Sequence, residues 1–261
     1  MKLAVISDIH GNLFALQAVL ADIARQSVDQ TVNLGDMLSG PLQPLETADL
    51  LMAQNFLTIR GNHERQMLTL HNRPGDITDI TTSDGHAASQ LLPAHWAWLR
   101  SLHISHALGD EVLLCHGTPA SDLNYLLETV VPDFEQDRST GVRAATPAEV
   151  VGRLGQATHP VVLCGHTHVP RRVQSGGVLI VNPGSVGLPA YDDVHPHPHV
   201  IETGSPHARY ALLKKTGLGW QVKLRAVPYD HLAQAAVAAC RGREDWAHAL
   251  ATGFVKRPVG F

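Results

Sequence analysis

Cysteine and aromatic residues are scarce in this chain of 261 residues, which has 3 cysteines and 5% aromatic side chains. Cys115, Cys164 and Cys240 lie far apart in the sequence and form no C-x-x-C pair. We therefore predict neither a disulfide framework nor a thiolate zinc site. The same cysteine usage favours a reducing, cytoplasmic location.

Long apolar stretches and basic clusters are missing as well. No apolar run is long enough to cross a bilayer, and the run at residues 3–6 is too short for the core of a signal peptide. The formal net charge is -4, and the longest runs of Lys and Arg are pairs. Long nucleic acids and anionic membranes attract concentrated positive charge, so we expect neither as a partner.

The hydrophobic residues, 44% of the chain, are arranged in short strand-length runs and in helical periods. Three such runs, each followed by a loop and a helical pattern, occupy residues 2–7, 30–34 and 56–59. After about residue 104 the pattern changes to strand pairs around Gly-containing turns at residues 109–110, 175–177 and 217–219. No linker or repeat divides the chain, so we expect one α/β domain over residues 1–261 with mixed sheets.

Histidine is unusually abundant, with 17 residues. Four of these histidines, His195, His197, His199 and His207, lie in a His/Pro-rich segment, residues 192–207. The alternation with proline predicts that this segment is an extended, exposed loop insertion. Its alternative functional roles are the storage of metal ions and a contribution to the rim of the substrate site. Residues 72–83 and 119–145 also look irregular, and all three segments are expected to form rims over a site.

Five short polar motifs each follow a predicted strand. They are Asp8-Ile9-His10, Gly35-Asp36, Gly61-Asn62-His63-Glu64, His116-Gly117 and Gly165-His166-Thr167-His168. Ligands gather at the carboxyl ends of the strands in open α/β sheets, so we expect the motifs to converge. Each motif alone occurs often by chance, but an ordered set of five at strand ends is a strong signal.

These residue types suit a pair of divalent cations roughly 3.5–4 Å apart. One ligand must bridge the two ions, and Asp36, a charged carboxylate central in the series, is expected to do so. Asp8, His10 and His168 are expected to complete one metal site. The other site is expected to use Asn62, His116 and His166. Mixed nitrogen and oxygen ligands suit Mn, Fe, Zn, Co or Ni better than Mg, and we favour Mn.

Such a centre predicts phosphate-ester chemistry. Two divalent cations less two Asp charges leave local positive charge, which attracts a phosphate ester to an acidic protein. A water between two Lewis-acidic ions loses a proton near neutral pH and becomes an in-line nucleophile at phosphorus. No Ser or Cys nucleophile is needed, so we expect metal-bridging hydroxide to attack a small phosphate-ester substrate.

The five motifs, in this order, resemble those of the calcineurin-like metallophosphoesterases. The resemblance spans about residues 1–187 and extends less specifically over residues 208–229. It implies a four-layer αββα sandwich, with two mixed β-sheets flanked by helices and a dinuclear site at the strand ends. It also implies that His63 contacts the phosphate and acts as the general acid for the leaving oxygen. His63 and Asp36 would then be catalytic, and Asn62 and His63 would bind substrate.

One motif departs from the wider group, whose protein Ser/Thr phosphatases carry G-D-x-x-D-R-G. This chain reads Gly-Asp-Met-Leu-Ser-Gly at residues 35–40, which lacks the second acid and the arginine. The departure disfavours phosphoproteins as substrates and leaves open which group orients His63. Glu64 is adjacent to His63. An ordinary surface salt bridge between Glu64 and Arg60 is an equally good interpretation of this residue, so we assign it no role.

Residues 115–119 and 182–187 are similar to segments of small bacterial phosphodiesterase-type members. We therefore expect hydrolysis of a phosphodiester or another small phosphate ester, a nucleotide-derived one included. A phosphomonoesterase is the alternative among enzymes. A non-catalytic interaction scaffold is the alternative outside them, and the presence of His63 and all seven ligand residues disfavours it.

Overall fold

The computed structural model describes residues 1–72 and 79–257, which form two packed sheets covered by helices. The first sheet has the order β14-β13-β1-β2-β3. Its strands are β1 (Lys2–Ile6), β2 (Gln30–Asn33), β3 (Leu57–Thr58), β13 (Ala208–Thr216) and β14 (Gly219–Val227). β1, β2 and β3 run parallel, whereas β13 pairs antiparallel with both β1 and β14.

The second sheet has the order β4-β5-β8-β10-β9. Its strands are β4 (Ser105–Leu108), β5 (Val112–Cys115), β8 (Val161–Leu163), β9 (Arg171–Ser175) and β10 (Val178–Asn182). The core β5-β8-β10 is parallel and both edges are antiparallel. The three turns predicted from glycine do join antiparallel neighbours, β4 to β5, β9 to β10 and β13 to β14.

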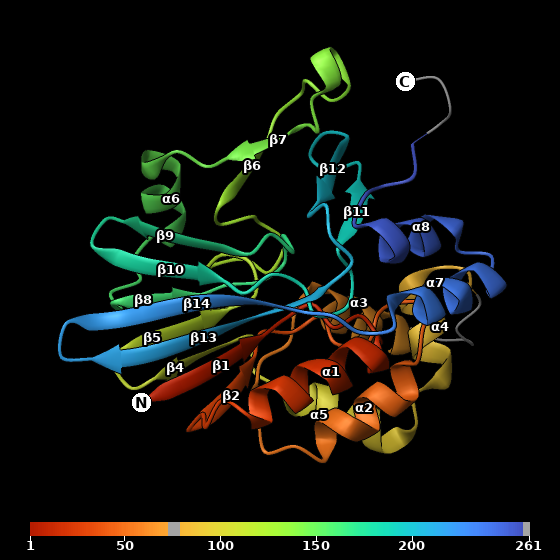
Figure 1. The fold of residues 1–261 in the computed structure, drawn as a ribbon, viewed down its shortest axis with the longest axis horizontal. Coiled ribbons are helices and arrows are strands. Elements are labelled where there is room, and N and C mark those ends of the chain that lie inside the picture. The colour runs from red at the N-terminus through yellow and green to blue at the C-terminus, as the bar shows by residue number, and fades with distance from the viewer. Residues whose placement is uncertain (73–78, 258–261) are drawn as a thin grey trace.

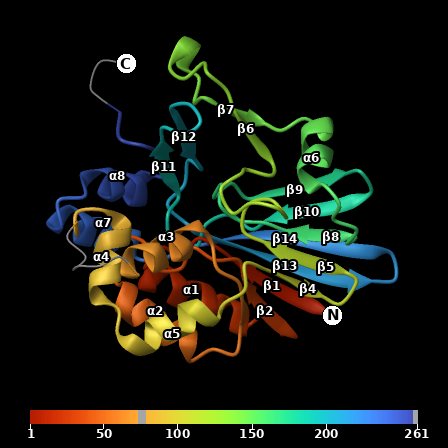
Figure 2. The same ribbon diagram turned by 180° about the vertical axis from the view of Figure 1, so that it is seen from behind.

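Side-chain alternation along the strands explains the layers. In β1, Leu3 and Val5 point between the two sheets, where they pack with Leu114 and Leu163. Ala4 and Ile6 point the other way and pack against helices with residues such as Leu16. Figures 1 and 2 show helices α1 (Leu13–Ala24), α2 (Pro44–Met52) and α5 (Pro93–Ser101) on this outer face.

The fourth layer is α6 (Pro147–Leu154), which begins at Pro147 after the N-cap Thr146. Its buried Val150 and Leu154 cover the outer face of the second sheet. The predicted four-layer αββα sandwich with mixed sheets is therefore confirmed. The other helices are α3 (Asn62–His71), α4 (Ser83–Gln90), α7 (His231–Cys240) and α8 (Glu244–Thr252). Among the described helices, none combines the length and apolarity needed to span a bilayer.

Two of the segments expected to be irregular contain strands. Residues 119–145 hold the hairpin of β6 (Glu128–Val130) and β7 (Val142–Ala144). Within residues 192–207, the expectation of an extended exposed loop is wrong in part, because β11 (Ala190–Asp193) and β12 (His199–Glu202) form a second hairpin. Val200 and Ile201 of β12 are buried, and their burial fixes this hairpin against the body of the protein. Of the segment 72–83, residues 73–78 lie outside the described residues.

Candidate metal centre

All seven expected ligands lie at one edge of the sandwich, where the parallel strands of both sheets end. Asp8 and His10 follow β1, and Asp36 follows β2. Asn62 begins α3. His116 follows β5, while His166 and His168 follow β8. The two sheets are packed face to face, so residues separated by up to 158 positions come within hydrogen-bond distance.

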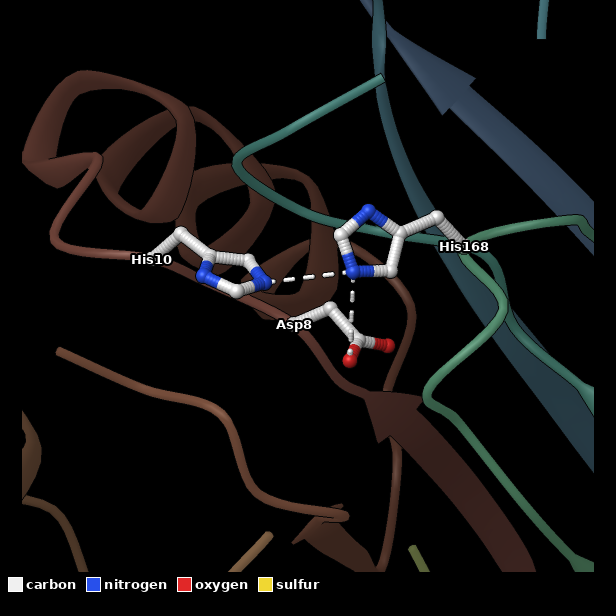
Figure 3. Close-up of side chains that lie close together, drawn as sticks. All are labelled: Asp8, His10 and His168. Atoms are coloured by element: carbon white, nitrogen blue, oxygen red, sulfur yellow. Dashed lines mark hydrogen bonds and ion pairs between the residues drawn. The ribbon is translucent and has the colours of Figure 1, made fainter. Parts of the chain in front are cut away.

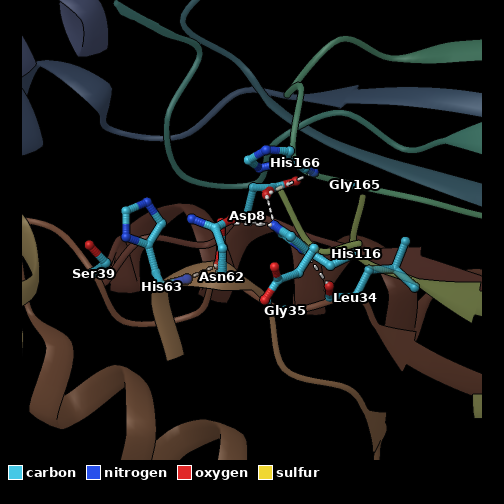
Figure 4. A network of polar contacts seen from close by, with 12 residues as sticks. Asp8, Leu34, Gly35, Ser39, Asn62, His63, His116, Gly165 and His166 are labelled. Carbon is cyan, nitrogen blue, oxygen red and sulfur yellow. Dashed lines mark hydrogen bonds and ion pairs between the residues drawn. The ribbon is translucent and has the colours of Figure 1, made fainter. Parts of the chain in front are cut away.

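The side chains form two adjacent groups; Figure 3 shows Asp8 with His10 and His168, and Figure 4 shows Asn62, His116 and His166 of the second group. In each group, the atoms able to bind a metal lie within 4.8 Å of one another. One group is Asp8, His10 and His168, and the other is Asp36, His116 and His166. Asn62 joins the second group, because its Oδ1 lies 3.1 Å from His116 Nε2. The sequence analysis places Asp36 between the two ions, whereas in the structure its carboxylate groups with His116 and His166.

Hydrogen bonds to main-chain carbonyls orient all four imidazoles. Nδ1 of the ring lies 2.8 Å from Ser39 O for His10, 2.8 Å from Leu34 O for His116 and 2.7 Å from Leu188 O for His168. His166 uses the opposite nitrogen, with Nε2 3.0 Å from Leu123 O. A carbonyl accepts only, so the bonded nitrogen carries a proton, and the other nitrogen of each ring faces the site, where it can bind a metal when it is unprotonated.

The first group holds acceptors that face one another. His10 Nε2 lies 3.1 Å from His168 Nε2, although both rings donate their Nδ1 protons to carbonyls. Asp8 Oδ1 lies 3.5 Å from His168 Nε2, and the buried Asp8 Oδ2 has no hydrogen-bond partner among the described residues. Lone pairs held this close repel unless a cation lies between them, so the donor set fits a metal ion.

Burial sets the protonation of most of these groups. It lowers the pKa of His10 to about 4 and that of His166 to about 3, which keeps both imidazoles neutral and able to bind a metal. Burial also raises the pKa of Asp8 to about 7, against the opposing charge of His116. Burial alone would lower the pKa of His116, but the charges of Asp36 and Asp8 raise it to about 10.

The chain turns sharply to present these side chains. Five of the seven ligands have positive φ, between 53° and 68°. They are Asp8, His10, Asp36, His166 and His168. A residue with a side chain loses roughly 1–2 kcal/mol in this left-handed conformation. Strain of this kind persists only where surrounding contacts determine the backbone, and it is concentrated at functional sites.

His63 lies beside the two groups, with its ring centroid 5.5 Å from that of His10. Its main-chain N–H donates to Asp36 Oδ1 at 3.0 Å, and its Nδ1 lies 2.8 Å from Asp84 Oδ1. Burial alone would lower the pKa of His63, but Asp36 and Asp84 raise it to about 9. Asp84 is therefore the group that orients His63, and the sequence analysis did not identify it.

Glu64 is neither free nor part of a surface salt bridge with Arg60, so that alternative is wrong. Its side chain is fully buried and accepts main-chain N–H donors from Gly61, Asp36 and Met37, each at 2.8 Å. The carboxylate therefore ties the start of α3 to the loop after β2. This bond network fixes the backbone that carries Asp36 and Asn62.

Two tyrosines that the sequence left undefined lie behind the histidines. Tyr125 packs edge-on against His166, and Tyr191 packs edge-on against His168, with centroids 5.0 and 4.7 Å apart. Their hydroxyls lie 2.7 Å apart, and Tyr125 Oη lies 3.0 Å from His199 Nε2. His199 is buried, which excludes free exposure for this part of the His/Pro-rich segment.

The centre opens into a cavity of about 1220 Å³. His10, Asn62 and His63 line its floor, and β6 and the β11–β12 hairpin contribute two walls. A further wall comes from α8 and the residues after it, which the sequence analysis did not predict as a helix. The volume greatly exceeds that of a phosphate group, so the site has room for the organic part of an ester.

Comparisons with known proteins agree with this architecture. A family model described as the calcineurin-like phosphoesterase superfamily domain matches residues 1–203. An uncharacterized protein of Methanocaldococcus jannaschii is 28% identical over 210 residues, which are 72% of this chain and 76% of that protein.

Solved structures give the same answer. The crystal structure of a metallophosphoesterase from Sphaerobacter thermophilus is 25% identical with a TM-score of 0.74, and the match covers 97% of this chain and 99% of that one. A hypothetical protein from Pyrococcus horikoshii OT3 is 20% identical with a TM-score of 0.71, covers 97% and 98%, and shares the fold. The family match, the four-layer fold and the two ligand groups together establish that this chain belongs to the calcineurin-like phosphoesterase superfamily.

Proposed function

We propose that the protein is a dinuclear-metal-dependent phosphohydrolase that cleaves a phosphodiester. The observation that carries the proposal is the convergence of seven side chains, with the imidazole nitrogens that bond no carbonyl directed inward. Asp8, His10 and His168 would hold one ion. Asn62, His116 and His166 would hold the other, with Asp36 between the two. Bound divalent ions supply Lewis-acid stabilisation of phosphoryl oxygens and lower the pKa of water, and we favour Mn²⁺.

His63 is assigned the role of general acid. The Asp84 carboxylate at Nδ1 raises the pKa of His63 and so favours the protonated imidazole, which is the form that can donate a proton to a leaving oxygen. Asp84 holds the ring at Nδ1, so the other ring nitrogen is the one available to substrate. Asn62 begins the same helix turn and would contact the phosphate beside His63.

A diester is favoured over a monoester because three separate segments, β6, the β11–β12 hairpin and α8, line a cavity of about 1220 Å³ next to the ligand groups. A diester needs space for two organic groups, whereas a monoester needs space for one. The likeness of residues 115–119 and 182–187 to phosphodiesterase-type segments supports the same choice. We further propose that residues 1–261 form a single domain, that the protein is cytoplasmic and that its substrate is a small phosphate ester.

The direct test uses the purified protein with Mn²⁺, bis(4-nitrophenyl) phosphate and 4-nitrophenyl phosphate. We expect the diester to be hydrolysed with the higher kcat/KM, and we expect chelation to abolish turnover. Faster turnover of the monoester would favour the phosphomonoesterase. Equal inertness with and without added metal, across a panel of phosphate esters, would favour the interaction scaffold.

A further inference from the structure

The wall of the cavity formed by α8 brings a cation close to the general acid. Arg243, the N-cap of α8, lines the same cavity as His63 and Asn62. Its Nη1 donates to Ser83 Oγ at 3.0 Å. Ser83 directly precedes Asp84, which holds His63, so the guanidinium lies on the His63 side of the cavity.

The loop at residues 35–40 explains why α8 can approach this closely. Gly40 occupies the position of the arginine in G-D-x-x-D-R-G. A Cβ atom at Gly40 would lie 2.8 Å from Trp246 Cη2, so the indole fills the space next to this glycine. Trp246 also lies 5.9 Å from His10, measured between ring centroids, and Arg243 lies over its face at 5.6 Å.

The Arg243 guanidinium is held in place by hydrogen bonds that do not use all of its N–H donors. Asp245 accepts from Nε at 3.0 and 3.2 Å and from Nη2 at 2.6 Å. A guanidinium has five N–H donors, and Nη1 and Nη2 each carry a second N–H that these contacts do not use. A fixed fork of this kind suits a phosphate, because ordering the side chain costs little further entropy.

Other cations continue along the same wall. Lys256 and Arg257 line the cavity beyond α8. Their partners are Glu244 at 3.5 Å and Glu202 at 3.1 Å, and the lysine pair is exposed on both sides. Exposed pairs contribute little and are easily exchanged, so the Lys256 side chain remains able to attract an anionic group.

We propose that Arg243 is a specificity-determining residue that binds a phosphate carried by the leaving group of the substrate. This inference rests on the proposed function. If His63 protonates the leaving oxygen, the leaving group lies on the His63 side of the cavity, which is where Arg243 is. The substrate class is then a phosphodiester whose departing alcohol bears a second phosphate. The scissile phosphate lies at the ligand groups, and the second phosphate lies toward α8.

The test compares two synthetic diesters that differ in whether the leaving phenol carries a phosphonate group. One is methyl 4-methylphenyl phosphate, and the other is methyl 4-(phosphonomethyl)phenyl phosphate, whose phosphonate resists hydrolysis. We expect the Mn²⁺-loaded protein to prefer the phosphonate-bearing ester. Arg243→Gln should lower the ratio of the two kcat/KM values by about ten-fold or more, the effect of one charge-assisted contact. Arg243→Lys should restore part of that ratio.

Arg143 provides the matched control. Its guanidinium pairs with Glu149 at 2.8 Å on both terminal nitrogens, outside the cavity. Arg143→Gln should therefore leave the ratio as in the wild type. If Arg243→Gln lowered turnover of both esters equally, Arg243 would be only a clamp for α8 and the proposal would be overturned.

Equilibrium binding separates this proposal from the proposed function. The product analogue (4-hydroxybenzyl)phosphonate can be titrated into wild-type protein and Arg243→Gln by calorimetry, with 4-methylphenol as the neutral probe. We expect the variant to lose about ten-fold or more in phosphonate affinity. Equal phosphonate affinity in both proteins would overturn the role of Arg243. If neither ester were turned over but the affinities differed, the hydrolase proposal would fail while the phosphate site stood.

Discussion

His63 Nδ1 lies 2.8 Å from Asp84 Oδ1, across 21 positions of sequence. Asp84 stands in the first turn of α4, whereas the second acid of G-D-x-x-D-R-G would fall at Ser39. The carboxylate that the motif lacks is thus supplied from a different helix. Because the imidazole is held on one nitrogen, its remaining nitrogen has a defined direction and protonation state.

The first prediction concerns the pH dependence of Asp84→Asn. The Asp84 charge helps to raise the pKa of His63 to about 9, so its removal should lower that pKa. The acid form exists below the pKa and is lost above it, so the alkaline limb of kcat/KM should move to lower pH. We also expect about a ten-fold loss of kcat for an unactivated diester at pH 8.

Profiles measured from pH 6 to 10 would check this shift. Asp49→Asn is the control, because Asp49 pairs with His95 at 2.9 Å away from the ligand groups. A uniform loss of rate with an unmoved alkaline limb would show that Asp84 does not tune His63.

The second prediction concerns His63→Gln, which removes the proton donor and keeps a side chain of similar length. Metal content should stay as in the wild type. Turnover should fall by about 100-fold or more for diesters with poor leaving groups, the usual contribution of a general acid. Activated aryl esters should recover part of the rate, because their leaving oxygens need no proton. A series of leaving groups would reveal this, and an equal loss across the series would argue against acid catalysis.

The third prediction is a stability effect at Glu64. Glu64→Ala leaves three main-chain donors without their acceptor, at Gly61, Asp36 and Met37. We expect the free energy of unfolding to fall by about 3 kcal/mol, because buried unsatisfied donors are costly. Urea unfolding of the metal-free protein measures this loss. Glu46→Gln, at an exposed acid in the first turn of α2, should change it little. A similar effect from both substitutions would contradict the anchoring role.

The fourth prediction tests the bridge. Asp36→Asn replaces the charged carboxylate proposed to lie between two cations with a neutral amide, so metal occupancy should fall below two ions per chain. Elemental analysis after gel filtration measures the ratio. Asp192→Asn, at an exposed rim residue, should leave the ratio as in the wild type. Two ions retained in Asp36→Asn would contradict the bridging role.

The ligand groups could be predicted from the sequence because each motif follows the carboxyl end of a strand. A run such as residues 2–7 shows where a strand ends, and the parallel order of strands then brings the ends together. Asp8, Asp36 and His116 were found in this way. The layers followed from the same runs, since alternation along β1 assigns Leu3 and Ala4 to opposite faces.

The residues that support the ligand groups could not be predicted from the sequence, for physical reasons. Asp84 lies in the first turn of a short helix, α4, whose segment, Ser83–Gln90, has no strong apolar period, so neither the helix nor its contact with His63 was apparent. Arg243 and Trp246 reach the centre only through tertiary packing of α8 near Gly40. For His199 a signal did exist. The apolar pair Val200 and Ile201 follows it directly, and their burial outweighs the exposure suggested by the His-Pro alternation.

The most direct test of the paired-cation centre is anomalous X-ray diffraction from crystals grown with Mn²⁺, recorded on both sides of the manganese edge. We predict two anomalous peaks roughly 3.5–4 Å apart, the usual spacing in two-metal sites. One peak should lie among Asp8, His10 and His168, and the other among Asn62, His116 and His166. The absence of both peaks, or a lone peak away from these side chains, would contradict the account.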